Sequence, residues 1–113
     1  SIILSTLLDD TQAIYLTDFF KVLPKSKITV EFYYYVPANL PTELDFYTKF
    51  YTLNHIVEEK KEATLTRKFG GWHQYRKTFV VPQNSYEMAL RFESESGIVF
   101  IDDIKVTPEG LNP

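Results

Sequence analysis

The 113-residue chain lacks several features on which particular functions depend. It contains no cysteine, which rules out disulfides and thiolate chemistry. No apolar run reaches the 18 residues of a candidate membrane-spanning helix. The chain has no basic block and a formal net charge of −3, so nucleic acid is not a predicted partner. It has no Gly-x-Ser-x-Gly, P-loop or His-Glu-x-x-His motif, and its two histidines have no acidic partners at zinc-ligand spacing. We therefore predict that the chain is not an enzyme.

Aromatic residues are plentiful instead. They make up 16% of the chain, with nine Phe and eight Tyr, and this composition favours strands. The length fits one domain over residues 1–113. The chain opens on the apolar Ile2-Ile3-Leu4 without a Met, so we expect a piece excised from a longer polypeptide.

Short apolar stretches separated by Gly, Pro and polar turns predict strands throughout the chain. The predicted strands cover 14–22, 28–36, 44–53, 72–81, 86–94 and 98–107. Residues 58–62, Glu-Glu-Lys-Lys-Glu, are predicted as a solvated loop or strand edge in preference to a helical turn. No segment shows a sustained helical period, which indicates an all-β sandwich or barrel.

Alternation along the predicted strands separates a core face from an outer face. The predicted core comprises Ile28, Val30, Phe32, Phe46, Phe50, Phe79, Met88, Leu90 and Phe92. The opposite parity holds four tyrosines together with charged residues: Tyr33, Tyr35, Tyr47 and Tyr51, with Glu31, Lys49 and Arg91. We expect these residues to form one platform on one sheet.

A surface of tyrosines beside charged groups suits a carbohydrate ligand. An aromatic ring can cover the apolar face of a sugar, while charged side chains hydrogen-bond its hydroxyls. The alternative is structural, because tyrosine favours strands and cross-strand aromatic pairs stabilise sheets. Trp72, after Gly70-Gly71, also has two interpretations: a sugar platform at a loop edge, or core and edge packing, which we favour.

The second half of the chain carries an ordered set of motifs. They are Trp72, Tyr75, Thr78-Phe79, Val81-Pro82, Leu90 with Phe92, and Ile101-Asp102-Asp103-Ile104. In this order they resemble carbohydrate-binding modules of families four, nine and twenty-two, which have the galactose-binding-like jelly-roll fold. The resemblance spans roughly residues 14–107. It implies an antiparallel two-sheet β-sandwich of the jelly-roll type. The family's usual opening, an Asn-rich turn followed by Phe-Glu, is absent.

Two adjacent acids, Asp102 and Asp103, interrupt the last apolar stretch. The resemblance implies a structural calcium ion held by Asp102 first and Asp103 second, with further ligands from segments that the sequence does not identify. Calcium requires six to eight oxygens, which two carboxylates cannot supply. Adjacent strand residues also point to opposite faces, so one acid would instead cap a turn or meet a Lys or Arg. The same geometry argues against a catalytic carboxylate pair.

The resemblance favours a non-catalytic carbohydrate-binding module that docks a parent protein onto a polysaccharide or cell-surface glycan. The alternative is an adhesion or assembly domain of a larger particle, such as a phage tail or baseplate, whose tyrosine face contacts protein. Either function implies an extracellular, cell-surface or virion location, and contact with other domains or chains is an open possibility.

Overall fold

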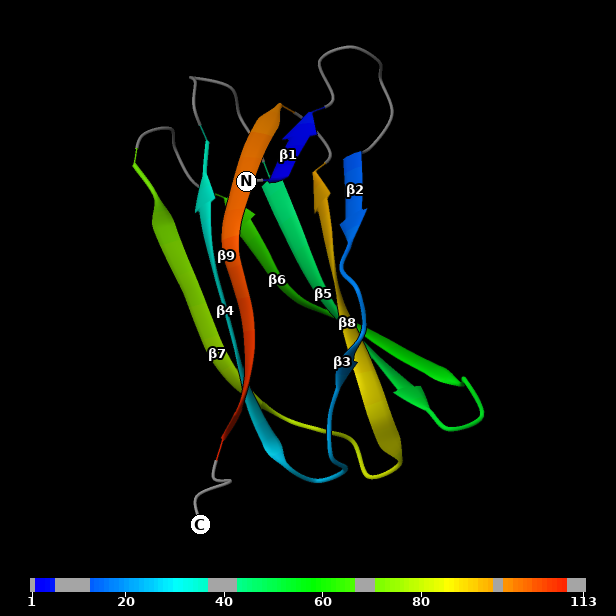
Figure 1. Ribbon diagram of the computed structural model, residues 1–113. Helices are drawn as coiled ribbons and strands as arrows, with labels where there is room; N and C mark the ends of the chain where they lie inside the picture. Colours follow the sequence, from blue (N-terminus) through cyan, green and yellow to red (C-terminus); the bar gives the residue numbers. More distant parts are fainter. Residues whose placement is uncertain (1, 6–12, 37–42, 67–70, 95–96, 110–113) are drawn as a thin grey trace.

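The computed structural model describes residues 2–5, 13–36, 43–66, 71–94 and 97–109, which form nine strands and no helix (Figure 1). In chain order the strands are β1 (Ile2–Ser5), β2 (Ala13–Leu16), β3 (Phe20–Lys21), β4 (Lys27–Tyr35), β5 (Glu43–Thr52), β6 (Val57–Thr66), β7 (His73–Val80), β8 (Ser85–Ser94) and β9 (Ile98–Glu109). No helix in this part of the chain is long and apolar enough to cross a membrane.

The strands form two sheets that lie face to face (Figure 1). The four-stranded sheet has the order β1-β9-β4-β7, and the five-stranded sheet has the order β2-β8-β5-β6 with β3 also paired to β8. Every strand pair is antiparallel. The predicted all-β, two-sheet antiparallel sandwich is therefore confirmed.

The predicted strand 14–22 is in fact two short strands, β2 and β3, on the same side of β8. The break begins at the buried Thr17, whose backbone N–H donates to the Leu90 carbonyl at 3.0 Å. The Thr17 hydroxyl accepts from the Leu90 N–H at 2.9 Å, taking the place of a backbone acceptor. The alternation of apolar and polar residues cannot predict a side-chain contact of this kind.

The polar segment 58–62 belongs to β6, an edge strand that pairs with β5 over its whole length. Charged residues are common on edge strands because they discourage pairing with another chain. The expectation of a strand edge is confirmed.

The core lies between the sheets and matches the alternation pattern closely. Eight of the nine predicted core residues are buried: Ile28, Val30, Phe32, Phe46, Phe50, Met88, Leu90 and Phe92. The ninth, Phe79, is only partly buried and packs against the edge of the cluster, because β7 is an edge strand.

Four aromatic rings at the centre of the core join the two sheets. Phe32 and Tyr75 come from the four-stranded sheet, and Phe46 and Phe92 come from the five-stranded sheet. The Phe32 ring centroid lies 5.1 Å from that of Phe46, 4.8 Å from that of Phe92 and 4.9 Å from that of Tyr75. Such pairs add to the free energy gained by burying apolar area.

Tyr75 brings a polar atom into this cluster. Its hydroxyl is buried and has no hydrogen-bond partner among the described residues. Desolvation, followed by the negative charge of Glu62, raises the pKa of Tyr75 to about 12. The ring therefore stabilises the core while its hydroxyl costs stability.

We predict that Phe32→Ala lowers the free energy of unfolding by about 3–5 kcal/mol, because it removes ring contacts to both sheets and leaves a cavity. Urea unfolding followed by circular dichroism measures the change. Val80→Ala is the control, since Val80 is 63% exposed and its replacement should change stability by less than about 0.5 kcal/mol. Equal effects of the two variants would contradict the central role of Phe32.

We predict that Tyr75→Phe raises the free energy of unfolding at pH 7 by about 1 kcal/mol, because it removes a buried unpaired hydroxyl. In the wild type, the unfolded chain loses this proton near the ordinary tyrosine pKa of 10.0, whereas the folded chain keeps it to about pH 12. Stability therefore falls as the pH rises through that window, and Tyr75→Phe should reduce the fall. Urea unfolding at about pH 7 and about pH 11 tests both expectations, with the exposed Tyr86→Phe as control.

Candidate functional site

The predicted ligand residues lie on the outer faces of two different sheets. Tyr33 and Tyr35 belong to β4, which pairs with β7 and β9, whereas Tyr47 and Tyr51 belong to β5, which pairs with β6 and β8. The parity prediction is right, but the prediction of one platform on one sheet is wrong. Alternation determines which way a side chain points, and it carries no information on which strand becomes a neighbour.

On the five-stranded sheet, Arg91 and Tyr47 form the centre of the outer face. They are directly opposite each other on β8 and β5, and the Arg91 guanidinium lies 4.0 Å from the centroid of the Tyr47 ring. At this distance the cation is attracted to the electron-rich ring face. We call these two residues the arginine–tyrosine pair.

Carboxylates hold the arginine of this pair in place. Glu93 Oε2 lies 2.9 Å from Arg91 Nη1, and Glu59 Oε2 lies 3.2 Å from Arg91 Nε. The Glu59 contact is electrostatic, because the buried Nε has no partner with hydrogen-bond geometry among the described residues. The two carboxylates thus fix the orientation of the guanidinium from both sides.

Further charged pairs surround the arginine–tyrosine pair. Lys49 Nζ lies 3.8 Å from Glu59 Oε2, and Lys61 Nζ lies 3.3 Å from Asp45 Oδ1. The Thr64 hydroxyl also donates to Asp45 Oδ1, at 2.8 Å. Asp45, although on the outer face, is only 2% exposed. The face is thus a dense array of donors and acceptors, already oriented by one another.

Tyr51 lies at the edge of the same face. The Phe19 ring meets it edge-on, with centroids 5.0 Å apart, and Lys49 Nζ lies 5.9 Å from its centroid. Of the predicted ligand residues, the structure thus brings Tyr47, Tyr51, Lys49 and Arg91 together on one surface.

The other half of the predicted set lies on the four-stranded sheet. Tyr35 contacts Trp72, with centroids 5.4 Å apart, and Phe100 of β9, with centroids 6.0 Å apart. Tyr33 lies on the same face of β4, and Ile3 of β1 is directly opposite Phe100. We call Trp72, Tyr35, Phe100, Tyr33 and Ile3 the aromatic strip. Trp72 thus packs at a sheet edge, as favoured, while its role in binding stays a prediction.

Polar side chains border the aromatic strip along β4 and β7. Arg76 Nε lies 3.2 Å from Glu31 Oε1, and the Gln74 amide donates to the same oxygen at 3.4 Å. Glu31, predicted beside the tyrosines, therefore shares an outer face with Tyr33 and Tyr35 and lies on the other sheet from Tyr47 and Tyr51.

Among the residues that sequence reasoning missed on these faces are Glu59 and Phe100. Glu59 lies in a charged stretch whose composition conceals the parity of its residues. Phe100 lies in an apolar stretch whose composition is typical of a buried strand. Its side chain, however, has the parity opposite to that of the buried Val99 and Ile101. Alternation through this stretch is the signal that places Phe100 on the outer face.

Asp102 and Asp103 lie at a bulge in β9. Tyr33 is opposite Asp102 and Glu31 is opposite Lys105, so Asp103 and Ile104 together face Phe32 alone. Asp103 has a φ of 52°, and its N–H donates to Asp102 Oδ1 at 2.9 Å. Asp tolerates this left-handed conformation better than most residues. The bulge therefore explains why two acids interrupt this apolar strand.

The described residues do not complete a calcium site. Nowhere in this part of the chain do three or more His, Asp or Glu side chains gather to hold a metal ion. Asp102 already accepts a backbone N–H, and calcium requires several more oxygens than the two acids provide. Calcium binding at Asp102 and Asp103 stays a prediction.

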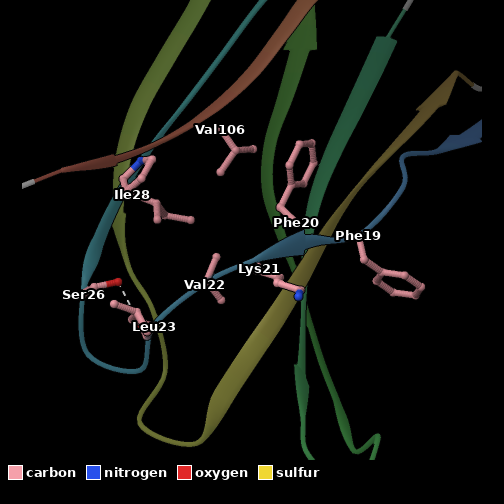
Figure 2. Close-up of a pocket in the computed structure, with 9 residues that line it drawn as sticks. Phe19, Phe20, Lys21, Val22, Leu23, Ser26, Ile28 and Val106 are labelled. Carbon is pink, nitrogen blue, oxygen red and sulfur yellow. Dashed lines mark hydrogen bonds between the residues drawn. The ribbon is translucent and has the colours of Figure 1, made fainter. Parts of the chain in front are cut away.

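A cavity of about 410 Å³ opens where β3, the start of β4 and the end of β9 meet (Figure 2). Its lining is largely apolar and includes Phe20, Val22 and Ile28, with Val106 from β9. None of the predicted ligand residues lines it.

No protein-family model and no curated protein matches the chain. Solved structures do match its fold. Tailspike protein 4 of bacteriophage CBA120, in its enzymatically active domain, has a TM-score of 0.69 at 14% identity, over 86% of this chain and 14% of that one. The family 22 module and catalytic module of Clostridium thermocellum xylanase 10B, complexed with xylohexaose, have a TM-score of 0.67 at 11% identity, over 84% and 20%. The chain thus spans a small part of both.

An isolated module gives a match of more equal length. The C-terminal family 22 carbohydrate-binding module of C. thermocellum xylanase 10B has a TM-score of 0.62 at 9% identity, over 90% of this chain and 84% of that one. A family 4 structure also matches, with a TM-score of 0.57 at 14% identity. The jelly-roll sandwich of such modules, expected from the sequence, is therefore confirmed as the fold of this chain.

We predict that Asp103→Val lowers the free energy of unfolding by about 1–2 kcal/mol, because a β-branched residue is strained at this positive φ. Asp103→Gly should be close to neutral. Urea unfolding in calcium and in chelator separates the bulge from a metal site. If the bulge explanation holds, each variant has the same stability in calcium as in chelator. A calcium-dependent stability lost in Asp103→Gly and in Asp102→Ala would favour the metal site instead.

Proposed function

We propose that the chain is a non-catalytic carbohydrate-binding module that docks a parent protein onto a polysaccharide or cell-surface glycan. The fold supports this proposal, since several of its structural neighbours are modules of this kind. Fold alone does not define function, so the proposal depends on the chemistry of a surface. An extracellular or cell-surface location is part of the same proposal.

The arginine–tyrosine pair is the observation that carries the proposal. The Tyr47 ring holds the Arg91 guanidinium against its face, while Arg91, held also by Glu93, supplies fixed N–H donors. Sugars present apolar C–H faces and rings of hydroxyls, which such a combination recognises. Because carboxylates and the Tyr47 ring already position Arg91, little conformational entropy would be lost on binding.

Carboxylate acceptors complete the proposed site. Glu59 contacts both Arg91 and Lys49, and Glu93 contacts Arg91, so acceptors and donors alternate across the face. The cations are paired with acids, which suits hydroxyl groups better than a strongly charged ligand. We place the ligand on the outer face of the five-stranded sheet, over β5 and β8.

A second candidate is an adhesion or assembly domain of a larger particle. The likeness to a bacteriophage tailspike favours it. In that case the outer face of the five-stranded sheet would contact protein, and no glycan would bind there.

We predict that the chain binds a glycan and that Tyr47→Ala weakens binding about fivefold or more, because the ring that positions the Arg91 donors is lost. Arg91→Lys should weaken binding too, since lysine keeps the charge and lacks the planar set of donors. A glycan array identifies the ligand, and isothermal titration calorimetry measures its affinity. Gln83→Ala, in an exposed turn, is the control.

Two results would count against this site. Unchanged affinity in both variants would place glycan binding elsewhere. A wild-type chain that binds no glycan on the array would favour the assembly domain, and Tyr47 should then be protected from solvent only in the presence of a protein partner.

A further inference from the structure

The aromatic strip differs from the arginine–tyrosine pair in what covers its rings. On the five-stranded sheet, Arg91 lies over Tyr47, and Lys49 lies near Tyr51. On the four-stranded sheet, the neighbours of Tyr35 are other rings, those of Trp72 and Phe100. The rings of Tyr35 and Phe100 are stacked with 27° between their planes, so they form one apolar cluster that is partly exposed.

This surface is exposed although it is built from three separate parts of the chain. Trp72 precedes β7, Tyr35 ends β4, and Phe100 lies in β9. Tyr33, Trp72 and Ile3 are 37, 47 and 59% exposed. With about 150–250 Å² for each aromatic side chain, the strip offers on the order of 300–400 Å² of apolar area.

The size of the strip decides which kind of partner it suits. A stable protein interface takes about 800 Å² from each partner, roughly twice what the strip provides. A short stretch of sugar rings needs less area and binds through flat apolar faces. Exposed apolar patches of a few hundred Å² on monomers are often functional.

The border of the strip also suits a sugar. Glu31 is paired with Arg76, and Gln74 donates to the same carboxylate. Asp102 lies opposite Tyr33 and Lys105 lies opposite Glu31, so the acids and bases along this border are matched in number. Uncharged hydroxyls are the complementary chemistry.

We propose that the aromatic strip is a second glycan-binding surface that stacks neutral sugar rings and acts independently of the arginine–tyrosine pair. The inference rests on the proposed function of glycan binding and extends it to two sites. Because the two surfaces lie on opposite sides of the sandwich, one module would hold two glycan chains at once. Binding at the strip depends on stacking, whereas binding at the other face depends on hydrogen bonds from Arg91.

The chain itself supplies a separate reporter for each surface. Trp72 is the only tryptophan, so indole fluorescence and the indole Nε1–H signal report on the strip alone. The Arg91 Nε–H signal reports on the other face. We would titrate the ¹⁵N-labelled chain with xylohexaose and, separately, with cellohexaose, as two neutral oligosaccharide probes.

We predict that a probe shifts the Trp72 indole signal and fluorescence, and that Tyr35→Ala weakens this response about fivefold or more. The Arg91 response should be unchanged in Tyr35→Ala. Val80→Ala is the matched control, since Val80 is an exposed apolar residue on the same face at the other end of β7. Arg91→Lys should leave the Trp72 response intact. Circular dichroism confirms that each variant is folded.

The outcomes separate the two proposals. A response of Arg91 alone overturns the second surface and leaves the proposed function standing. A response of Trp72 alone supports the strip and overturns the site on the other face. A Trp72 response that survives Tyr35→Ala, or that is lost in Val80→Ala, overturns stacking at the strip. If neither reporter responds to either probe, both proposals are overturned for neutral β-linked chains.

Discussion

The contact of Phe32 with Phe46 and Phe92 is the interaction on which the rest of the molecule depends. It joins the two sheets at their centre, in a chain that has no disulfide to do so. Each sheet has an apolar inner face, so neither would be stable in water without the other. Because this contact fixes the inner parity of β4, β5 and β8, it also fixes which side chains face outward. Tyr47, Arg91 and Tyr35 are on the surface because Phe46, Phe92 and Tyr34 are buried beside them.

The sequence predicted this inward and outward pattern well and the pairing of strands poorly. A period of two is a local property, so Phe32 and Tyr33 could be assigned to opposite faces from their own stretch of chain. Whether β4 neighbours β5 depends on contacts between distant residues, such as Tyr34 with Ile101 and Phe46 with Phe92. Nothing in the tyrosine pattern distinguishes two strands of one sheet from two strands of opposite sheets. For this reason the candidate residues were found and their arrangement was not.

Irregular positions were the other limit of prediction. Thr17 breaks a strand through its hydroxyl, and Asp103 makes a bulge through a positive φ. Each effect depends on a single residue, so it leaves no periodic pattern in the sequence. The charged run of β6 hides its alternation because an edge strand is solvated along one side, so Glu58 and Glu59 are both exposed. The resemblance to binding modules implied a metal at Asp102, whereas the local geometry of the bulge explains the same two acids without one.

The two outer faces show how the same residue type acquires different chemistry from its cross-strand partner. Tyr47 is opposite Arg91 and Lys61, so its ring is covered by cations and the face recognises ligands mainly through oriented donors. Tyr35 is opposite Phe100 and near Trp72, so its ring extends an apolar surface. Both tyrosines satisfy the same parity rule on strands of similar composition. The difference lies in β8 and β9, which place arginine beside one ring and phenylalanine beside the other. Sheet pairing, and not tyrosine content, therefore determines what each face can bind.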